Sequence, residues 1–373
     1  MMRKFKAALM RGGVCRGLIF KQEDLPTDRA EWDSIFLQAL GGPDAKQIDG
    51  VGGGVSSNSK AVVVSKSNRA DVDIEYLSVQ IVVGSTTVDY SSNCGNMSAA
   101  VGPFAVEEGL VTATHPITEI RMLNLNTNKI VVNCVPTENG ILSQDGDFCL
   151  DGIDGTAPRI ELRFLNPAGA KTGSLLPTDR SVDRLHVEGF ADIDATILDV
   201  SNPMVLVRAE DVGLMGTELP TELESNEAVM TYLEAIRCTA AMKIGFGKTM
   251  KDAQDNFSGV PKIAIFSAPQ PYIDLTGRKL NTSDMDICVR VLSVRQPHKA
   301  SPFTSANAIA VATVLPDTLP GAALNLVGRT SVRIGHPSGV MHIPLSIKNG
   351  SIDYVSIEST ARRIMDGLIR IRV

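Results

Sequence analysis

The chain has 373 residues, of which 43% are hydrophobic and 21% are charged, and its formal net charge is −6. This composition is typical of a soluble globular protein, and the length favours two domains over one. The negative charge and the absence of a basic run exclude an electrostatic nucleic-acid surface, and no apolar run reaches the roughly 20 residues that a membrane span requires.

Strand patterns rich in Val, Ile, Thr and Tyr dominate the chain, and Gly84-Ser85 predicts a hairpin turn. In chain order the expected strands are 62–65, 74–83, 86–90, 129–135, 159–164, 195–200, 204–208, 262–266 and 287–294. Helical periodicity is limited to 29–40, 97–108, 227–245 and 305–315. Long runs of strands with a few separate helices predict an α+β fold, not a doubly wound parallel sheet.

Two pairs of similar segments recur in the same order, each pair about 200 residues apart. One pair is an apolar strand followed by a basic residue, a spacer, Glu-Asp and an aliphatic residue; the other is a helix of small residues. The pairs are Gly17–Leu25 with Met204–Val212, and Asn96–Val101 with Ser305–Ala312. The repetition predicts two similar domains, 1–182 and 183–373.

The six cysteines lie at positions 15, 94, 134, 149, 238 and 288. None forms a C-x-x-C pair or lies at metal-ligand spacing from a histidine, so we expect no metal site. They are typical of reduced thiols that mostly fill the core, which favours the cytoplasm. The first six residues are basic, but the apolar run after them is too short for a secretory signal.

Cys94 is the exception among these thiols. Ser92-Asn93-Cys94-Gly95-Asn96-Met97 places it where a helix of small residues begins. The helix dipole and free amides lower the pKa of such a thiol, and those amides can also bind a carboxylate. The alternative is a buried cysteine that packs as a small hydrophobic residue, which we expect for cysteines 134, 149, 238 and 288.

Lys60 ends the glycine-rich and serine-rich stretch 46–60, directly before the β-branched run Val62-Val63-Val64. A phosphate-binding loop needs Gly-Lys-Ser/Thr at the start of a helix, which is absent here. A lysine behind such a loop could lose hydration, become partly neutral and act as a base. The alternative is a solvated lysine at the end of a simple turn.

Three further loops could present donors to a carboxylate, although each could equally be a surface loop. They are Arg11-Gly12-Gly13, Gln296-Pro297-His298-Lys299-Ala300 and Gly335-His336-Pro337-Ser338-Gly339.

Together these blocks resemble the family of 2-methylaconitate cis–trans isomerases, methylitaconate Δ-isomerases and 4-oxalomesaconate tautomerases (PrpF-like proteins). The resemblance runs nearly end to end and is specific as a combination. It rests on Met10-Arg11-Gly12-Gly13, Lys46-Gln47-Ile48-Asp49-Gly50, Ser56-Ser57-Asn58-Ser59-Lys60, Asn93-Cys94-Gly95-Asn96, His298-Lys299-Ala300 and Gly335-His336-Pro337-Ser338-Gly339.

The resemblance implies a diaminopimelate-epimerase-like fold. Such a fold has two pseudo-symmetric domains, each a β-barrel-like sheet around a central helix, with the site between them, and the final strand can return to the first domain. The family's lysine falls on Lys60 and its cysteine on Cys94. Where the family usually has Arg-Gly-Gly-Thr-Ser-Lys-Gly, this chain has Val14-Cys15-Arg16 in place of the polar triplet.

The expected activity is cofactor-independent isomerisation of a small unsaturated di- or tricarboxylate. Neutral Lys60 would remove a proton to give a dienolate, and Cys94 would reprotonate it, or the two roles would be exchanged. The substrate-binding candidates are Arg11, Gly12, Gly13, Ser56, Ser57, Asn93, Gly95, Asn96, Met97, His298, Lys299, Thr304, Ser305, His336 and Ser338.

Two other functions remain open at this point. One is an amino-acid epimerase on the same fold, but related epimerases use a second thiol where this chain has Pro302-Phe303-Thr304-Ser305. The other is a non-catalytic carboxylate-binding protein. No nucleic-acid or membrane partner is expected, and the sequence allows a homodimer.

Overall fold

A computed structural model describes residues 2–90, 94–293 and 295–372 of the chain. The chain folds into two compact units: unit 1 is Met1–Leu165 with Ile357–Val373, and unit 2 is Asn166–Ser356. The division lies before the expected boundary between 182 and 183. The reason is local pairing: the amide of Gly169 donates to Asp199 O at 2.8 Å, and the amide of Asp199 donates to Leu175 O at 2.9 Å.

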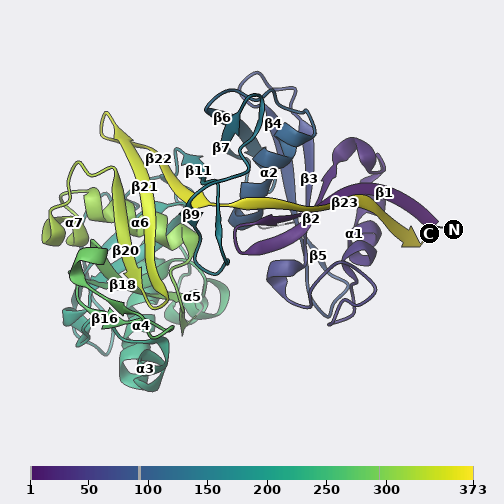
Figure 1. Cartoon of the computed structure of the whole chain (residues 1–373). Helices are drawn as coiled ribbons and strands as arrows, with labels where there is room; N and C mark the ends of the chain where they lie inside the picture. Colours follow the sequence, from purple (N-terminus) through teal and green to yellow (C-terminus); the bar gives the residue numbers. More distant parts are fainter. Residues whose placement is uncertain (1, 91–93, 294, 373) are drawn as a thin grey trace. The chain divides into compact units, whose positions relative to one another are not determined.

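Unit 1 is a strongly curved sheet around one helix, α2 (Gly95–Glu107) (Figure 1). Its strands are β1 (Met2–Gly12), β2 (Cys15–Lys21), β3 (Lys60–Lys66), β4 (Ile74–Ile81), β5 (Val88–Asp89), β6 (Ile117–Asn124), β7 (Lys129–Glu138), β8 (Ile141–Leu142), β9 (Phe148–Cys149), β10 (Thr156–Ala157), β11 (Ile160–Leu165) and β23 (Ala361–Arg372). The second helix, α1 (Trp32–Leu40), follows a 3-10 turn at Arg29–Glu31.

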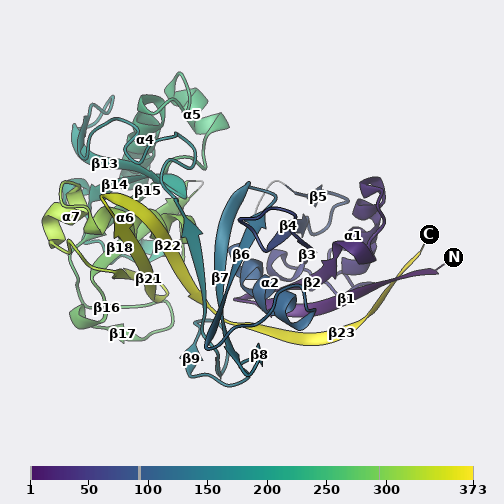
Figure 2. The same cartoon turned by 90° about the horizontal axis from the view of Figure 1, so that it is seen from above.

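The main ladder of unit 1 runs in the order β23-β1-β2-β3-β4-β6-β7-β11. The β2–β3 and β4–β6 pairs are parallel, and the others are antiparallel. β1 and β23 pair from Met2 opposite Arg372 to Gly12 opposite Ala361, so the two ends of the chain lie side by side in both views (Figures 1 and 2).

Unit 2 repeats the part of this order from β1 to β11 as β13-β14-β15-β18-β20-β21-β22; counted from β1 and from β13, the second and fourth pairs are parallel in both units. Its strands are β12 (Asp183–Leu185), β13 (Ile193–Val200), β14 (Asn202–Arg208), β15 (Lys262–Ser267), β16 (Tyr272–Ile273), β17 (Lys279–Leu280), β18 (Ile287–Ser293), β19 (Gln296–Pro297), β20 (Ser331–His336), β21 (Gly339–Lys348) and β22 (Ser351–Ser359, whose last three residues belong to unit 1). Its helices are α3 (Pro220–Ser225), α4 (Glu227–Lys243), α5 (Met250–Asn256), α6 (Phe303–Val314) and α7 (Leu319–Leu324).

The central helices are buried because their side chains are small and apolar. In α2 every residue from Met97 to Ala105 is buried, and in α6 every residue from Ser305 to Val314. Pro103 lies inside α2 and lacks the amide that would bond to the Ala99 carbonyl. The Asn133 side-chain amide from β7 lies 3.4 Å from that oxygen and 3.1 Å from Ser98 O, which compensates for the missing bond.

These observations confirm the expected α+β class and the four expected helices, each within three residues of its predicted start. The hairpin at Gly84-Ser85 is also confirmed, because β4 and β5 pair antiparallel around it. The strands β1, β6 and β20–β23 were not predicted from the sequence, and neither were the two- and three-residue strands β8–β10, β12, β16, β17 and β19. Cys149 corrects one expectation: it is exposed, not part of the core, because β9 is a two-residue strand of a surface hairpin.

Over the described residues, no helix has both the length and the hydropathy needed to cross a membrane.

Candidate active site in unit 1

A pocket of about 280 Å³ opens in unit 1 where the start of α2 faces strands β3 and β4. The lining residues are Cys15, Lys60, Ala61, Val62, Ser78, Val79, Gln80, Cys94, Gly95, Asn96 and Met97. Lys60 and Cys94, the two expected catalytic residues, therefore share one cavity, and three of the expected binding residues, Gly95, Asn96 and Met97, line it with them.

Cys94 is the N-cap residue of α2. Its carbonyl oxygen accepts hydrogen bonds from both the amide and the hydroxyl of Ser98, each at 3.0 Å. The Ser98 hydroxyl also lies 3.0 Å from the Tyr76 hydroxyl on β4, so the first helical turn is anchored to the sheet. A Cβ built on Gly95 would meet no atom of the described residues within 4 Å, apart from its chain neighbours and its own helix backbone, so space is open beside this residue.

The Cys94 sulfur lies 3.9 Å from the Cys15 sulfur. Either thiol could donate in this contact, but the Lys60 charge and the amides of Met97 and Asn96 favour negative charge on Cys94, so Cys15 is the donor. This hydrogen bond is the main cause that lowers the pKa of Cys94, and burial opposes it. The pKa of Cys15 is raised, first by the contact with Cys94 and then by burial.

Lys60 is the first residue of β3, as the sequence predicted, and its side chain is half-buried. Its ammonium group donates to Gln80 Oε1, from the residue opposite it on β4. The Gln80 amide nitrogen donates in turn to Ser59 O at 3.0 Å and Ile81 O at 2.9 Å. These bonds orient the Gln80 oxygen toward the lysine. Among the described residues, no carboxylate forms an ion pair with Lys60.

The glycine-rich loop before Lys60 folds around a buried side chain, Gln47, which is 1% exposed. Gln47 Oε1 accepts from the Ser59 hydroxyl at 2.6 Å and from the Gly54 amide at 3.0 Å. A Cβ at Gly52 would lie 2.2 Å from this oxygen, so only glycine fits there. The loop therefore fixes where β3 and Lys60 begin.

Ser56 and Ser57 do not line the pocket. Ser56 is exposed, and its carbonyl accepts a 3.3 Å hydrogen bond from Gln80, whereas the Ser57 hydroxyl lies 3.5 Å from the Asn58 side-chain oxygen. Asn93, another expected binding residue, lies outside the described residues.

Gly12 and Gly13 pack the β1–β2 turn against the start of α2. A Cβ at Gly12 would lie 2.4 Å from Asn96 O, and one at Gly13, where φ is +52°, would lie 2.1 Å from Asn96 Oδ1. Arg11 points elsewhere: its guanidinium donates to Gly13 O, Thr360 O and Thr360 Oγ1 at 2.8–3.1 Å. Arg11 lines a different cavity of unit 1, of about 500 Å³.

In unit 2, four of the residues expected to bind substrate lie close together: His298, Lys299, His336 and Ser338. His298 Nδ1 accepts from the Ala300 amide at 3.0 Å, and His336 Nδ1 accepts from the Ser338 amide at 3.2 Å. The Ser338 hydroxyl donates to the carbonyl of Lys299, whose side chain is exposed.

Both histidines are neutral at pH 7. Burial lowers the pKa of His298, and burial followed by the nearby Arg290 charge lowers the pKa of His336 to about 4. Since Nδ1 is the acceptor in each ring, the proton of the neutral form lies on Nε2. Each ring therefore offers one N–H donor.

Thr304 and Ser305 lie in the first turn of α6. The Ser305 hydroxyl is fully buried and has no hydrogen-bond partner within the described part of the chain, and the same holds for the hydroxyl of Ser301, just before the helix. Buried hydroxyls without partners are rare because they lose hydration without compensation.

The sequence analysis missed Cys15, Ser78 and Gln80 as pocket residues. Cys15 had one signal, its place directly after the Gly-Gly turn where the resembling family has serine. Gln80 and Ser78 had none, because their position follows from the register between β3 and β4.

Comparison with known proteins places this chain in a family. Residues 2–372 match the family model described as PrpF protein. The chain is 37% identical to the 3-methylitaconate isomerase of Eubacterium barkeri over 98% of this chain and 97% of that protein. It is 35% identical to the 2-methyl-aconitate isomerase of Shewanella oneidensis (99% and 97% covered) and 37% identical to the 4-oxalomesaconate tautomerase of Pseudomonas putida (97% and 94% covered).

The fold agrees with these sequence matches. The solved structure of a methylitaconate-delta-isomerase superposes with a TM-score of 0.95 at 35% identity, covering 99% of this chain and 96% of that one. Since the family match spans the described chain and the named relatives are isomerases or a tautomerase, this protein belongs to the PrpF family.

Proposed function

We propose that this PrpF-family isomerase moves or rotates a C=C bond in a small unsaturated di- or tricarboxylate by proton transfer between Cys94, Lys60 and the substrate. The observation that supports the proposal is the shared pocket: Cys94 and Lys60 line one 280 Å³ cavity together with the first residues of α2. The relatives named for methylitaconate, 2-methylaconitate and 4-oxalomesaconate support this substrate class.

The electrostatics support a definite assignment of roles. The Cys15 thiol, the Lys60 charge and the first amides of α2 all favour the Cys94 thiolate, and a thiolate is the form that can accept a proton. We therefore assign proton abstraction to Cys94 and proton delivery to Lys60, which exchanges the roles first expected from the sequence. The substrate C–H bond breaks, and its electron pair spreads into the conjugated carboxylate as a dienolate.

The amides at the start of α2 would stabilise the charge on that dienolate. The Gly95 backbone is open to a ligand, and the helix dipole favours a carboxylate oxygen there. In the dienolate the former double bond has single-bond character, so it can rotate. Delivery of a proton to the same carbon or to the other end of the system then gives a cis–trans isomer or a shifted double bond.

For unit 2, taken by itself, we propose that the residues expected from the sequence bind a carboxylate. His298 and His336 present Nε2–H donors, and the Ser305 hydroxyl at the start of α6 has no hydrogen-bond partner among the described residues. Lys299, Thr304 and Ser338 complete the proposed set. Replacement of Ser305 by Ala is expected to raise KM more than it lowers kcat, because a hydroxyl that only binds substrate contributes uniformly to ground and transition states.

Proton exchange in D₂O tests the role assignment. Each of Cys94→Ala and Lys60→Met should lower isomerisation of 3-methylitaconate, 2-methylaconitate or 4-oxalomesaconate by roughly 10²–10⁴-fold. Lys60→Met should still exchange the substrate C–H with solvent deuterium, since abstraction needs only Cys94, whereas Cys94→Ala should lose exchange as well.

The matched controls are Cys149→Ala and Lys66→Met. Cys149 is an exposed thiol, and Lys66 is the exposed lysine at the far end of β3 from Lys60. Both variants should keep wild-type rates. Deuterium incorporation that survives in Cys94→Ala but disappears in Lys60→Met would reverse the roles, and wild-type isomerisation by both variants would refute the mechanism.

A further inference from the structure

Cys15 is a pocket residue to which the proposed reaction gives no proton-transfer role. It begins β2, is 7% exposed, and lies with its sulfur 3.9 Å from that of Cys94. Cys15 and Cys94 both line the same cavity, through which a small solute could reach the pair.

The backbone holds the two thiols together. Gly12 and Gly13 let the β1–β2 turn approach Asn96 so closely that a Cβ at either position would overlap its atoms. The Val14 amide also contacts Asn96 Oδ1 at 3.4 Å. Cys15 directly follows this turn, and Cys94 directly precedes α2, so the contact between the sulfurs is built on packed backbone and not on two mobile side chains.

The two thiols are chemically unequal. Cys94 is the nucleophilic member, because helix amides and the Lys60 charge stabilise its thiolate; Cys15 stays protonated beside it. This is the arrangement of an attacking and a resolving cysteine. The other cysteines differ: Cys134, Cys238 and Cys288 are buried elsewhere, and Cys149 is exposed.

We propose that Cys15 and Cys94 form a peroxide-reactive dithiol site that closes to a disulfide. The Cys94 thiolate attacks the O–O bond of hydrogen peroxide, which gives a sulfenic acid and a hydroxide that takes up a proton to become water. The Cys15 sulfur then attacks the Cys94 sulfur, the S–O bond breaks, and a second water leaves. Two thiols and one peroxide thus give one disulfide and two waters, and the sulfurs move from contact to about 2.05 Å apart.

Two consequences follow. The resolving thiol protects Cys94, because disulfide formation competes with irreversible oxidation to sulfinic acid. The disulfide also removes the thiolate from proton transfer, so the isomerase is reversibly switched off. This second consequence rests on the proposed function, whereas formation of the bond does not.

Peptide mass mapping after treatment of the full-length protein with hydrogen peroxide tests the site. In the wild type the peptides that contain Cys15 and Cys94 should become linked with the loss of two hydrogens, and dithiothreitol should restore both thiols. In Cys15→Ser, which carries the serine usual at this position in the resembling family, Cys94 should proceed to sulfinic acid that dithiothreitol does not reverse. Cys149→Ser should behave like the wild type.

The proposal is overturned if wild-type Cys94 is oxidised to sulfinic acid as fast as in Cys15→Ser, or if the linked peptides join another cysteine pair. The isomerase activity of the oxidised protein is measured in a separate experiment. A protein that carries the Cys15–Cys94 disulfide yet isomerises at the normal rate would refute the role of Cys94 in the proposed function and leave the dithiol site standing.

Discussion

Three groups act on the sulfur of Cys94: the thiol of Cys15, the ammonium group of Lys60 and the first amides of α2. Each stabilises the thiolate, and burial, which favours the neutral thiol, is outweighed. The balance depends on side chains that can be removed one at a time, so the contribution of each can be measured.

An ordinary cysteine has a pKa of about 8.5. We predict that the alkylation of Cys94 by iodoacetamide has its pH midpoint below this value. Cys15→Ala removes the hydrogen-bond donor and Lys60→Met removes a positive charge, so each should move the midpoint to higher pH. Alkylation is followed by peptide mass spectrometry, and exposed Cys149 in the same molecules is the internal reference. An unchanged midpoint in Cys15→Ala would show that the thiol contact does not stabilise the thiolate.

Lys60 and Cys94, which line one pocket, could be proposed as site residues from the sequence because their signals are local. One lysine follows a glycine-rich loop at a strand start, and one cysteine precedes a helix of small residues. Gln80 had no such signal, because it reaches Lys60 through strand register. The one signal at Cys15, its place after the Gly-Gly turn, did not predict its contact with Cys94, which arises from packing between segments 79 residues apart. Ser56 and Ser57 do not line the pocket with Lys60, because the loop that contains them folds around Gln47.

At the scale of elements, the helices were easier to predict than the outer strands. The apolar, small-residue composition of α2 and α6 marks a buried helix at any position. β23 is different, because most of its residues are exposed and charged residues occur on both of its faces. Neither β1 nor β23 shows a clean alternation of polar and apolar residues, and each gains its backbone hydrogen bonds from the other.

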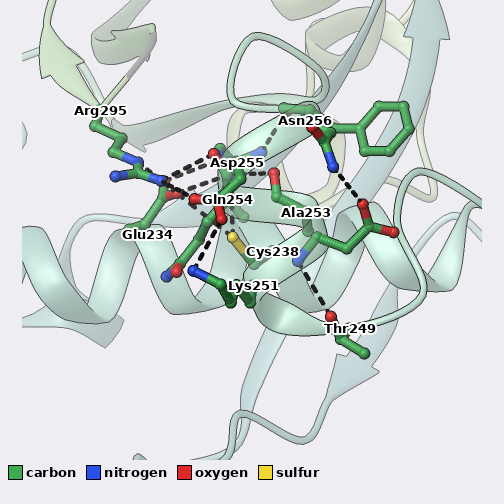
Figure 3. Close-up of polar contacts among 12 residues, drawn as sticks. Glu234, Cys238, Thr249, Lys251, Ala253, Gln254, Asp255, Asn256 and Arg295 are labelled. Carbon is green, nitrogen blue, oxygen red and sulfur yellow. Dashed lines mark hydrogen bonds and ion pairs between the residues drawn. The ribbon is translucent and has the colours of Figure 1, made fainter.

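The contact between α4 and α5 in unit 2 depends on a buried cation. Arg237 is 2% exposed, and both oxygens of Glu234 accept from it, at 2.7 and 2.8 Å. Arg237 also donates to Ala253 O and Phe257 O, which joins the two helices. Arg295 contributes a second cation 3.3 Å from Glu234, as the close-up shows (Figure 3).

We predict that Glu234→Ala lowers the free energy of unfolding by about 3–5 kcal/mol, because it leaves the buried Arg237 guanidinium without a carboxylate. Urea unfolding followed by circular dichroism measures the change. Glu224→Ala, at an exposed glutamate of α3, is the control and should stay within about 0.5 kcal/mol of the wild type. Replacing both members of the pair, with Glu234→Leu and Arg237→Met, should recover most of the loss; equal loss in the single and double variants would contradict this account.

At the scale of the whole molecule, the two units repeat one strand order around one buried helix. The repeated segments in the sequence indicated this duplication but did not locate the boundary between the units. Segment 166–182 belongs to unit 2 through backbone hydrogen bonds, which cannot be predicted from its amino-acid composition. Unit 1 is itself discontinuous: β23, from the end of the chain, completes the sheet that β1 begins.

Because β23 pairs with β1 to complete the sheet, we predict that unit 1 tolerates new chain ends in a loop but not within the β1–β23 pair. The chain ends lie opposite each other at Met2 and Arg372, so a linker of about four glycine and serine residues can join them. A circular permutant opened between Asn139 and Gly140, in the exposed turn after β7, should keep the buried environment of Trp32 and a Tm within about 5 °C of the wild type.

The matched permutant has the same linker but opens between Met365 and Asp366, inside β23. These residues pair with Leu9 and Ala8 of β1, so the cut interrupts the β1–β23 pair near its middle. Trp32 is the single tryptophan of the chain and lies in the core of unit 1, so its fluorescence reports on this unit. Its emission should shift toward that of an exposed indole in this permutant and not in the first. Equal emission from both would mean that unit 1 folds without an intact β1–β23 pair, because the linker and the joined ends are identical in the two proteins.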